Sequence, residues 1–141
     1  FCAVLSRIIF GYISDIIGPL KTLLIGSTLQ MITLILFIPF NTLTGLYVVS
    51  ILFGLSQGGI VPSYALIVKK YLPNKDAAER IGLIIFFTII GMSIGGWMSG
   101  KIYDYTNSYS LGFLNSILWN LLNVIIIFYL FVSFKKSKVS I

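Results

Sequence analysis

The run IGLIIFFTIIGMSIGGWMSG, residues 81–100, indicates a membrane-spanning helix, because its twenty residues include no charged side chain. A helix needs about 20 mostly apolar residues to cross roughly 30 Å of hydrocarbon. Two further charge-free stretches, residues 22–68 and 105–134, lie before and after it. The first is long enough for two crossings and the second for one. The sequence therefore predicts four membrane-spanning helices.

The overall composition agrees with a membrane protein and argues against other classes. The 141 residues have a mean hydropathy of +1.00 and 10% charged side chains, whereas soluble domains carry roughly 25%. The net charge of +6 comes from bases in short segments between apolar runs. These bases form no basic face, so no nucleic-acid partner is expected.

The residues available for chemistry are few. Cys2 is the single cysteine and there is no histidine, which argues against disulfide scaffolds, zinc sites and histidine-based catalysis. No paired acids lie within an apolar run. We therefore expect no enzyme, no metal site and no cofactor.

The fold class predicted is an all-α transmembrane helical bundle. The apolar runs are continuous and do not alternate every second residue, so they do not have the pattern of membrane-spanning strands. The predicted elements are a stub helix at 1–12, spans at about 22–39, 46–68, 81–100 and 111–134, and a tail at 135–141.

The basic residues predict how the helices are oriented. With four crossings, one side of the membrane receives nine bases and the other receives only Lys101. Because bases concentrate in cytoplasmic loops, we expect a multi-pass protein of the inner (plasma) membrane with a cytoplasmic C-terminus. The nine are Arg7, Lys21, Lys69, Lys70, Lys75, Arg80, Lys135, Lys136 and Lys138.

The apolar opening, residues 1–10, is about half a span long. We interpret it as the inner half of a helix whose beginning is missing, so the rest of a longer chain is an expected partner, together with the lipid bilayer. The alternative is a small four-span scaffold or subunit without transport activity.

The segment GYISDIIGPLK, residues 11–21, contains a recognisable pattern of a glycine, an acid four residues later, a second glycine and a base. It resembles the short cytoplasmic signature of the major facilitator superfamily. Gly11, Asp15, Gly18 and Lys21 match that signature, while Ile16 and Pro19 stand where it has bases. The resemblance implies that the stub and the four spans are the eighth to twelfth helices, part of the C-terminal six-helix half of a twelve-helix transporter that works by alternating access.

Arg7, Gly11 and Asp15 are spaced four apart and share one helix face. A glycine allows another helix to approach closely, and an acid neutralises the positive end of a neighbouring helix. This predicts a gating latch between bundle halves. The alternative is that Asp15 caps a loop and Arg7 reaches to the inner surface.

The segment SQGGIVPSY, residues 56–64, interrupts the second span at bilayer depth. Pro62 and the glycines Gly58 and Gly59 predict a helix kink, and interrupted helices mark the midplane site of many transporters. The predicted substrate-lining residues are Gln57, Ser63, Tyr64 and, in the third span, Thr88. The alternative is that Gln57 only bonds a neighbouring helix.

Small and polar residues in the spans predict helix packing. Thr88, Gly91, Gly95 and Ser99 form a small-residue face suited to close packing, and we favour that role over a gliding surface. Asn120 and Asn123 share a face in the fourth span, and Gln30 lies in the middle of the first. We expect these amides to form interhelical hydrogen bonds.

Three segments resemble bacterial transporters of the monocarboxylate and oxalate/formate-antiporter branch of the superfamily. The resemblance implies a small organic anion as substrate, with protons or a counter-anion as coupled solute. The segments are GGIVPSYALIV (58–68), IGMSIGGWMSGKIYDYTNSY (90–109) and FLNSILWNLLN (113–123).

Overall fold

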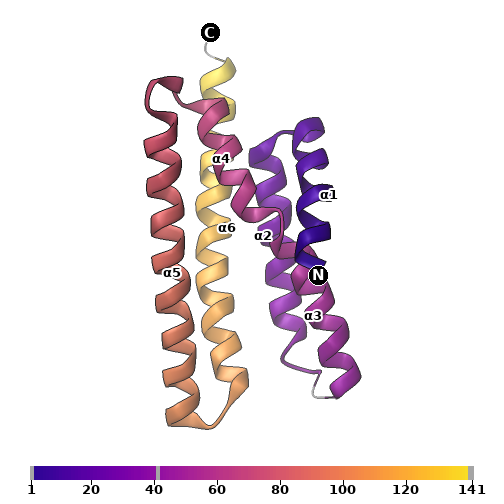
Figure 1. Ribbon diagram of the computed structural model, residues 1–141. Helices are drawn as coiled ribbons and strands as arrows, with labels where there is room; N and C mark the ends of the chain where they lie inside the picture. The colour runs from indigo at the N-terminus through magenta and orange to yellow at the C-terminus, as the bar shows by residue number, and fades with distance from the viewer. Residues whose placement is uncertain (1, 41, 140–141) are drawn as a thin grey trace.

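The computed structural model describes residues 2–40 and 42–139, and these residues form helices joined by short turns (Figure 1). Four segments have the length and apolar composition of membrane spans, namely α2, α3 with α4, α5, and α6 up to Phe134. The all-helical fold class is therefore confirmed, and the four segments agree with the four predicted spans. The elements are α1 (Cys2–Ile17), α2 (Pro19–Leu36), α3 (Leu43–Gln57), α4 (Ile60–Tyr71), the short 3-10 helix η1 (Asn74–Asp76), α5 (Ala77–Thr106) and α6 (Tyr109–Val139).

The connections alternate between the two ends of the bundle. Figure 1 shows the α1–α2 corner, the α4–α5 connection and the end of α6 at the top, and the α2–α3 and α5–α6 connections at the bottom. This arrangement places the base-rich connections at one end, as the charge pattern predicts.

The first connection is a one-residue corner, shorter than the loop implied by a stub at 1–12 and a span beginning at 22. α1 continues to Ile17 and therefore includes Asp15, and α2 starts at Pro19. Gly18 between them has φ +90°, a backbone conformation that side-chain-bearing residues rarely adopt. Pro19 suits the first position of α2, where no backbone N–H is needed. Asp15 thus sits on a helix and caps no loop.

α5 and α6 are both longer than their charge-free cores. α5 covers 77–106 where the sequence predicts 81–100, and α6 extends to Val139 where a tail is predicted from 135. Asn107 ends α5 in a left-handed conformation with φ +50°, and its N–H donates to the Tyr103 carbonyl at 2.8 Å. A helix ended in this way has its last carbonyls satisfied.

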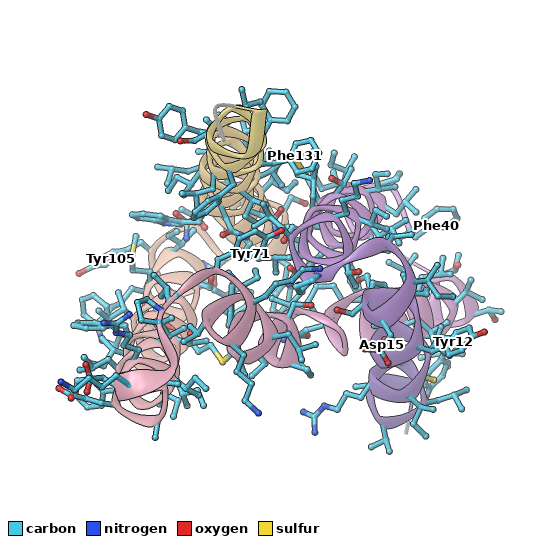
Figure 2. The ribbon with its side chains drawn as sticks, turned by 90° about the horizontal axis from the view of Figure 1, so that it is seen from above. Tyr12, Asp15, Phe40, Tyr71, Tyr105 and Phe131 are labelled. Carbon is cyan, nitrogen blue, oxygen red and sulfur yellow. The ribbon has the colours of Figure 1, made fainter. Side chains whose placement is uncertain are left out.

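The packing differs strongly between helices. Leu23, Ile60 and Ile127 form a buried cluster where α2, α4 and α6 meet, whereas α5 has no buried residue. Seen from above in Figure 2, Tyr12 and Tyr105 point outward on opposite sides of the bundle. Large exposed apolar side chains cover the outside of the helices, as expected for a protein whose solvent is lipid and other helices.

Candidate transport site

The second span is a discontinuous helix. α3 ends at Gln57 and α4 begins at Ile60, with Gly58 and Gly59 between them. Pro62 lies in the first turn of α4 and has no N–H, so it cannot donate to the Gly58 carbonyl. The interruption lies where the sequence predicts the kink.

α1 crosses this interruption at a distance that excludes any side chain on the two glycines. A Cβ placed on Gly58 would lie 2.5 Å from the Ala3 carbonyl oxygen and 2.6 Å from the Ser6 Cβ. A Cβ on Gly59 would lie 2.3 Å from the Phe10 ring. The two glycines therefore allow α1 to pack closely against the interruption, in addition to making the backbone flexible there.

Hydroxyl groups satisfy backbone carbonyls around the interruption. The Ser6 hydroxyl of α1 donates to the Leu55 carbonyl in the last turn of α3, where helical carbonyls lose their intrahelical partners. The Ser63 hydroxyl donates to the Gly59 carbonyl at 2.7 Å. An irregular backbone at membrane depth requires such partners, and here the Leu55 and Gly59 carbonyls have them.

The predicted substrate-lining residues do not meet in any of the three cavities described below. Ser63 is buried, and its hydroxyl is used by the backbone. Tyr64 packs beside the apolar cluster of Leu23, Ile60 and Ile127. The Thr88 hydroxyl donates to the Ile84 carbonyl at 2.7 Å. Gln57 is half-buried at the end of α3, next to the interruption, and its role stays a prediction.

The largest of the three cavities, about 740 Å³, lies between α2, α3, α5 and α6. Its lining combines small residues of α5 with amide and aromatic side chains of α6. It includes Gly91, Gly95, Ser99, Asn115, Trp119, Asn120, Asn123, Gln30 and Phe53.

Amide hydrogen bonds join α6 to α2 beside this cavity and confirm the predicted role of these residues. The Asn120 side-chain N–H donates to the Gln30 side-chain amide oxygen Oε1 at 3.0 Å, and the Asn123 side-chain N–H donates to the Ser27 hydroxyl at 3.3 Å. The Asn120 amide oxygen is buried without a partner among the residues described.

The small-residue face of α5 behaves differently from the prediction. A Cβ on Gly91 or Gly95 would have no neighbour within 4 Å, and both glycines line the large cavity. Ser99, on the same face, does lie beside α6, because a Cβ on Gly112 would be 3.9 Å from the Ser99 Cβ. Among residues 2–40 and 42–139, close packing is therefore absent at Gly91 and Gly95, and for these two glycines it stays a prediction.

The signature residues Arg7, Gly11 and Asp15 lie on the largely exposed side of α1, where Asp15 borders a small cavity next to α4. Arg7 and Asp15 are exposed, and a Cβ on Gly11 would have no neighbour within 4 Å. Among the described side chains, the single ion pair is that of Arg80 with Asp76, at 3.9 Å. Among the described residues, no other helix approaches Gly11 closely. The latch stays a prediction.

The other two signature residues, Gly18 and Lys21, lie at and just after the α1–α2 corner, and Lys21 is exposed. A small cavity of about 260 Å³ adjoins this corner. It is lined by Ser14, Asp15, Pro19, Leu66, Lys69 and Lys70.

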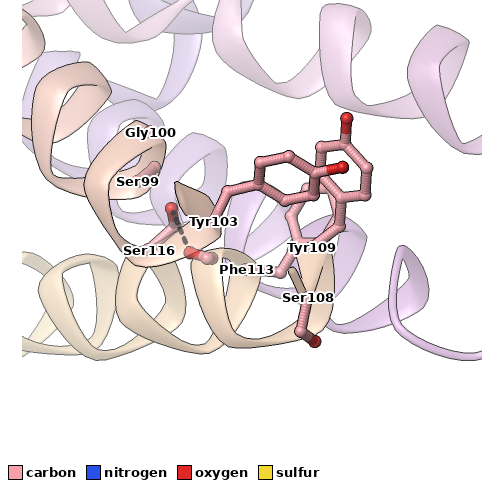
Figure 3. A pocket seen from close by; sticks show the side chains of 8 residues that line it. Ser99, Gly100, Tyr103, Ser108, Tyr109, Phe113 and Ser116 are labelled. Carbon is pink, nitrogen blue, oxygen red and sulfur yellow. Dashed lines mark hydrogen bonds between the residues drawn. The ribbon is translucent and has the colours of Figure 1, made fainter. Parts of the chain in front are cut away.

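A third cavity, of about 280 Å³, lies at the opposite end of the bundle between α5 and α6 (Figure 3). The rings of Tyr103 and Tyr109 stack there with centroids 4.2 Å apart. Ser116 lines the same cavity and donates to the Gly112 carbonyl at 3.1 Å. Paired tyrosines at a helix end suit the membrane–water interface.

Sequence reasoning missed the residues that α1 contributes to the crossing. Ser6, Phe10 and Ser14 are the buried residues of α1, and their spacing of four places them on one helix face. Gly26 of α2 joins the same crossing, because a Cβ there would lie 3.4 Å from the Phe10 ring. The sequence did contain a signal for this buried face, because Ser6, Phe10 and Ser14 are one aromatic and two small residues spaced four apart.

Comparison with known proteins gives concordant matches. The family model described as Major Facilitator Superfamily matches residues 1–140. The chain is similar to Monocarboxylate transporter 10 of Rattus norvegicus, with 28% identity over 116 residues, which are 77% of this chain and 22% of that protein. It is also similar to Monocarboxylate transporter 13 of the same organism, with 24% identity over 110 residues, covering 77% of this chain and 26% of that protein. No solved structure gives a significant match.

Proposed function

Because the chain belongs to the major facilitator superfamily, we propose that it works in secondary active transport of a small organic anion, such as a monocarboxylate, by alternating access. The chain spans about a quarter of the length of its two curated relatives. It would form part of the C-terminal half of a twelve-helix, multi-pass protein of the plasma membrane with a cytoplasmic C-terminus. Protons or a counter-anion are the proposed coupled solutes.

The observation that carries this proposal is the discontinuous helix α3–α4 at its crossing with α1. Interrupted helices at the bilayer midplane hold the solute site in many secondary transporters. Here the interruption at Gly58 and Gly59 is packed against α1 and has hydroxyl partners at Leu55 and Gly59. Gln57, at the end of α3, is the polar side chain that we propose to contact the solute.

The anionic substrate class is supported by the names of the relatives, since both are monocarboxylate transporters. The proposed cytoplasmic end also holds exposed bases, including Lys21, Lys69 and Lys70. A cationic end raises the local concentration of an anion as it enters or leaves. Because α1 continues past Arg7 to Ile17 and the neighbouring Ser6 contacts the interruption, Arg7 would meet the solute at the level of the interruption and not near the cytoplasmic exit, where the sequence predicts it.

Uptake by the full-length protein in proteoliposomes tests the proposal. Radiolabelled small carboxylates would be offered with and without an acid-outside pH gradient, and radiolabelled glucose would serve as the neutral control. Carboxylate uptake above protein-free vesicles supports transport. Absence of uptake of every carboxylate, under both conditions, would favour the small scaffold or subunit and contradict the proposal.

The solute contact at Gln57 is tested by a matched pair of glutamine variants. Gln57→Ala should raise KM about tenfold and leave the Tm unchanged, because a hydrogen bond to a charged group contributes about 1.5–3 kcal/mol. Gln30→Ala should lower the Tm and leave KM unchanged, because Gln30 bonds Asn120. A KM unaffected by Gln57→Ala would remove Gln57 from the site.

The latch is tested by Asp15→Asn. If Asp15 holds two bundle halves together through the positive end of a neighbouring helix, the variant should slow uptake while its amount in the membrane stays unchanged. Uptake kinetics equal to those of the wild type would refute the latch.

A further inference from the structure

The small cavity at the α1–α2 corner combines three features that together attract an anion. It lies where the last turn of α1, the first turn of α2 and the end of α4 meet, and its volume is about 260 Å³. We call it the corner cavity. The roles proposed above use residues of its rim, namely Asp15 in the latch and Lys69 and Lys70 in attracting the solute, but none uses the cavity as a binding site.

The first feature is the N-terminus of α2. This helix of 18 residues begins at Pro19, and Gly18 provides no side chain to cap it. The backbone N–H groups in the first turn of a helix have no intrahelical acceptor, and the aligned peptide dipoles make that end positive. Pro19 has no N–H and the Thr22 N–H donates to the Gly18 carbonyl at 3.1 Å, so Leu20 and Lys21 provide the remaining N–H groups of this turn.

The second feature is a buried hydroxyl without a partner. Ser14 is only 4% exposed, lines the corner cavity and forms no hydrogen bond through its Oγ. Six other buried polar side chains in the described part of the chain all have hydrogen bonds: Ser6, Thr22, Ser27, Thr33, Ser56 and Ser63. A buried hydroxyl left unpaired is costly, by about 1–3 kcal/mol, so Ser14 points to a missing ligand atom.

The third feature is the charge of the rim. Lys69 and Lys70 line the cavity from the end of α4, and Asp15 lines it from α1. The Lys70 ammonium lies 3.4 Å from the position that a Cβ on Gly18 would occupy, so it reaches the corner itself. Two bases against one acid leave the rim positive.

We propose that the corner cavity binds a phosphate group, supplied either by the headgroup of an acidic phospholipid or by free phosphate. A phosphate has oxygens directed to several sides, so it can accept hydrogen bonds from a lysine, a serine hydroxyl and a helix N-terminus together. The cavity lies at the ends of membrane-spanning helices, which is the depth of lipid headgroups. Asp15 opposes the bound anion and limits its affinity.

The test uses the full-length protein purified in detergent, with two probes at constant ionic strength. One probe is inorganic phosphate compared with chloride. The other is phosphatidylglycerol compared with phosphatidylcholine in mixed micelles. The readout is the rise in Tm with probe concentration, which gives an apparent affinity because a ligand that binds only the folded state stabilises it.

Four variants and the wild type decide the outcome. Lys70→Gln should weaken the apparent affinity about fivefold, as expected for one base near an anionic headgroup, and Ser14→Ala should weaken it by a similar factor of about five. Lys101→Gln at the opposite end of the bundle and Ser93→Ala on exposed α5 are matched controls and should leave the affinity unchanged.

Ser14→Ala provides a second readout that does not depend on the ligand. Because the hydroxyl is buried and unpaired, its removal should leave the ligand-free Tm equal or higher. Asp15→Asn should strengthen phosphate binding, which separates this role from the latch.

Each result has a defined meaning. Stabilisation by phosphatidylglycerol alone identifies a headgroup site, and stabilisation by inorganic phosphate alone identifies a free-anion site. Stabilisation by both identifies a site open to either source. The proposal is overturned if neither probe stabilises the protein, or if the effect is the same in Ser14→Ala and Lys70→Gln as in the wild type.

Discussion

The crossing of α1 with the α3–α4 interruption and the hairpin of α5 with α6 use glycine in opposite ways. At the crossing, Gly58 and Gly59 lie against Ser6 and Phe10 with no room for a methyl group. In the hairpin, Gly91 lies in the open, beside a cavity of about 740 Å³. Small residues in a membrane helix therefore permit close packing, but the partner helix decides whether it occurs.

The largest effect is expected for Gly59→Ala. The added Cβ would lie 2.3 Å from the Phe10 ring, so α1 must move away from the interruption. Overpacking of this kind typically costs about 1–3 kcal/mol and occasionally more, which thermal unfolding in detergent would measure. A Tm equal to that of the wild type would show that α1 does not contact the interruption as described.

A companion variant identifies the contact. Phe10→Leu in the Gly59→Ala background should restore part of the lost stability, because it removes ring atoms next to the new methyl group. The two substitutions should be strongly non-additive, as expected for residues in contact. Additive effects would indicate that Gly59→Ala acts elsewhere.

A smaller effect is expected for Ser6→Ala. The variant leaves the Leu55 carbonyl without the hydroxyl that now donates to it, and a typical hydrogen bond contributes about 0.5–1.5 kcal/mol. The Tm should fall, whereas Ser93→Ala, on exposed α5, should leave it unchanged. Equal Tm values for both variants would mean that the interruption does not need this donor.

A still smaller effect is expected for the amide pair of Gln30 with Asn120. Interhelical hydrogen bonds in membranes average about 0.6 kcal/mol in double-mutant cycles. A cycle with Gln30→Leu and Asn120→Leu should give a coupling energy of this size. A coupling of zero would show that α2 and α6 are held together by packing alone.

The smallest loss of stability is expected for Gly91→Ala. Nothing lies within 4 Å of the new methyl group, and alanine is favoured over glycine in a helix by up to about 1 kcal/mol. The Tm should therefore stay level or rise slightly. A marked fall in the Tm would mean that a segment outside residues 2–40 and 42–139 packs on this face of α5.

The sequence predicted the spans and their alternation well, because long charge-free runs and clustered bases are strong signals. It also predicted that Asn120, Asn123 and Gln30 form interhelical hydrogen bonds, since few polar groups lie at that depth and each needs a partner, but it did not predict which residues pair. Helix ends were predicted less well. α5 and α6 extend past their apolar cores because backbone hydrogen bonding continues into the polar boundary, where hydropathy gives no signal.

The contacts of the candidate site were harder to predict. Glycine spacing gave Gly58, Gly59, Gly91 and Gly95 the same expected role, and only the position of α1 separates the first two from the others. The crossing residues Ser6 and Phe10 lie about 50 positions before the interruption in the sequence, so no local pattern links them to it.

The α1–α2 corner has a mechanical consequence. Gly18 alone joins the two helices, with its N–H bonded to the Ser14 carbonyl and its carbonyl bonded to the Thr22 N–H. Because these backbone hydrogen bonds restrict rotation on both sides of Gly18, we expect a tilt of α1 to tilt α2 as well. α2 is in turn hydrogen-bonded to α6 through Gln30 and Ser27. We therefore expect a movement of α1 to be transmitted through α2 to α6.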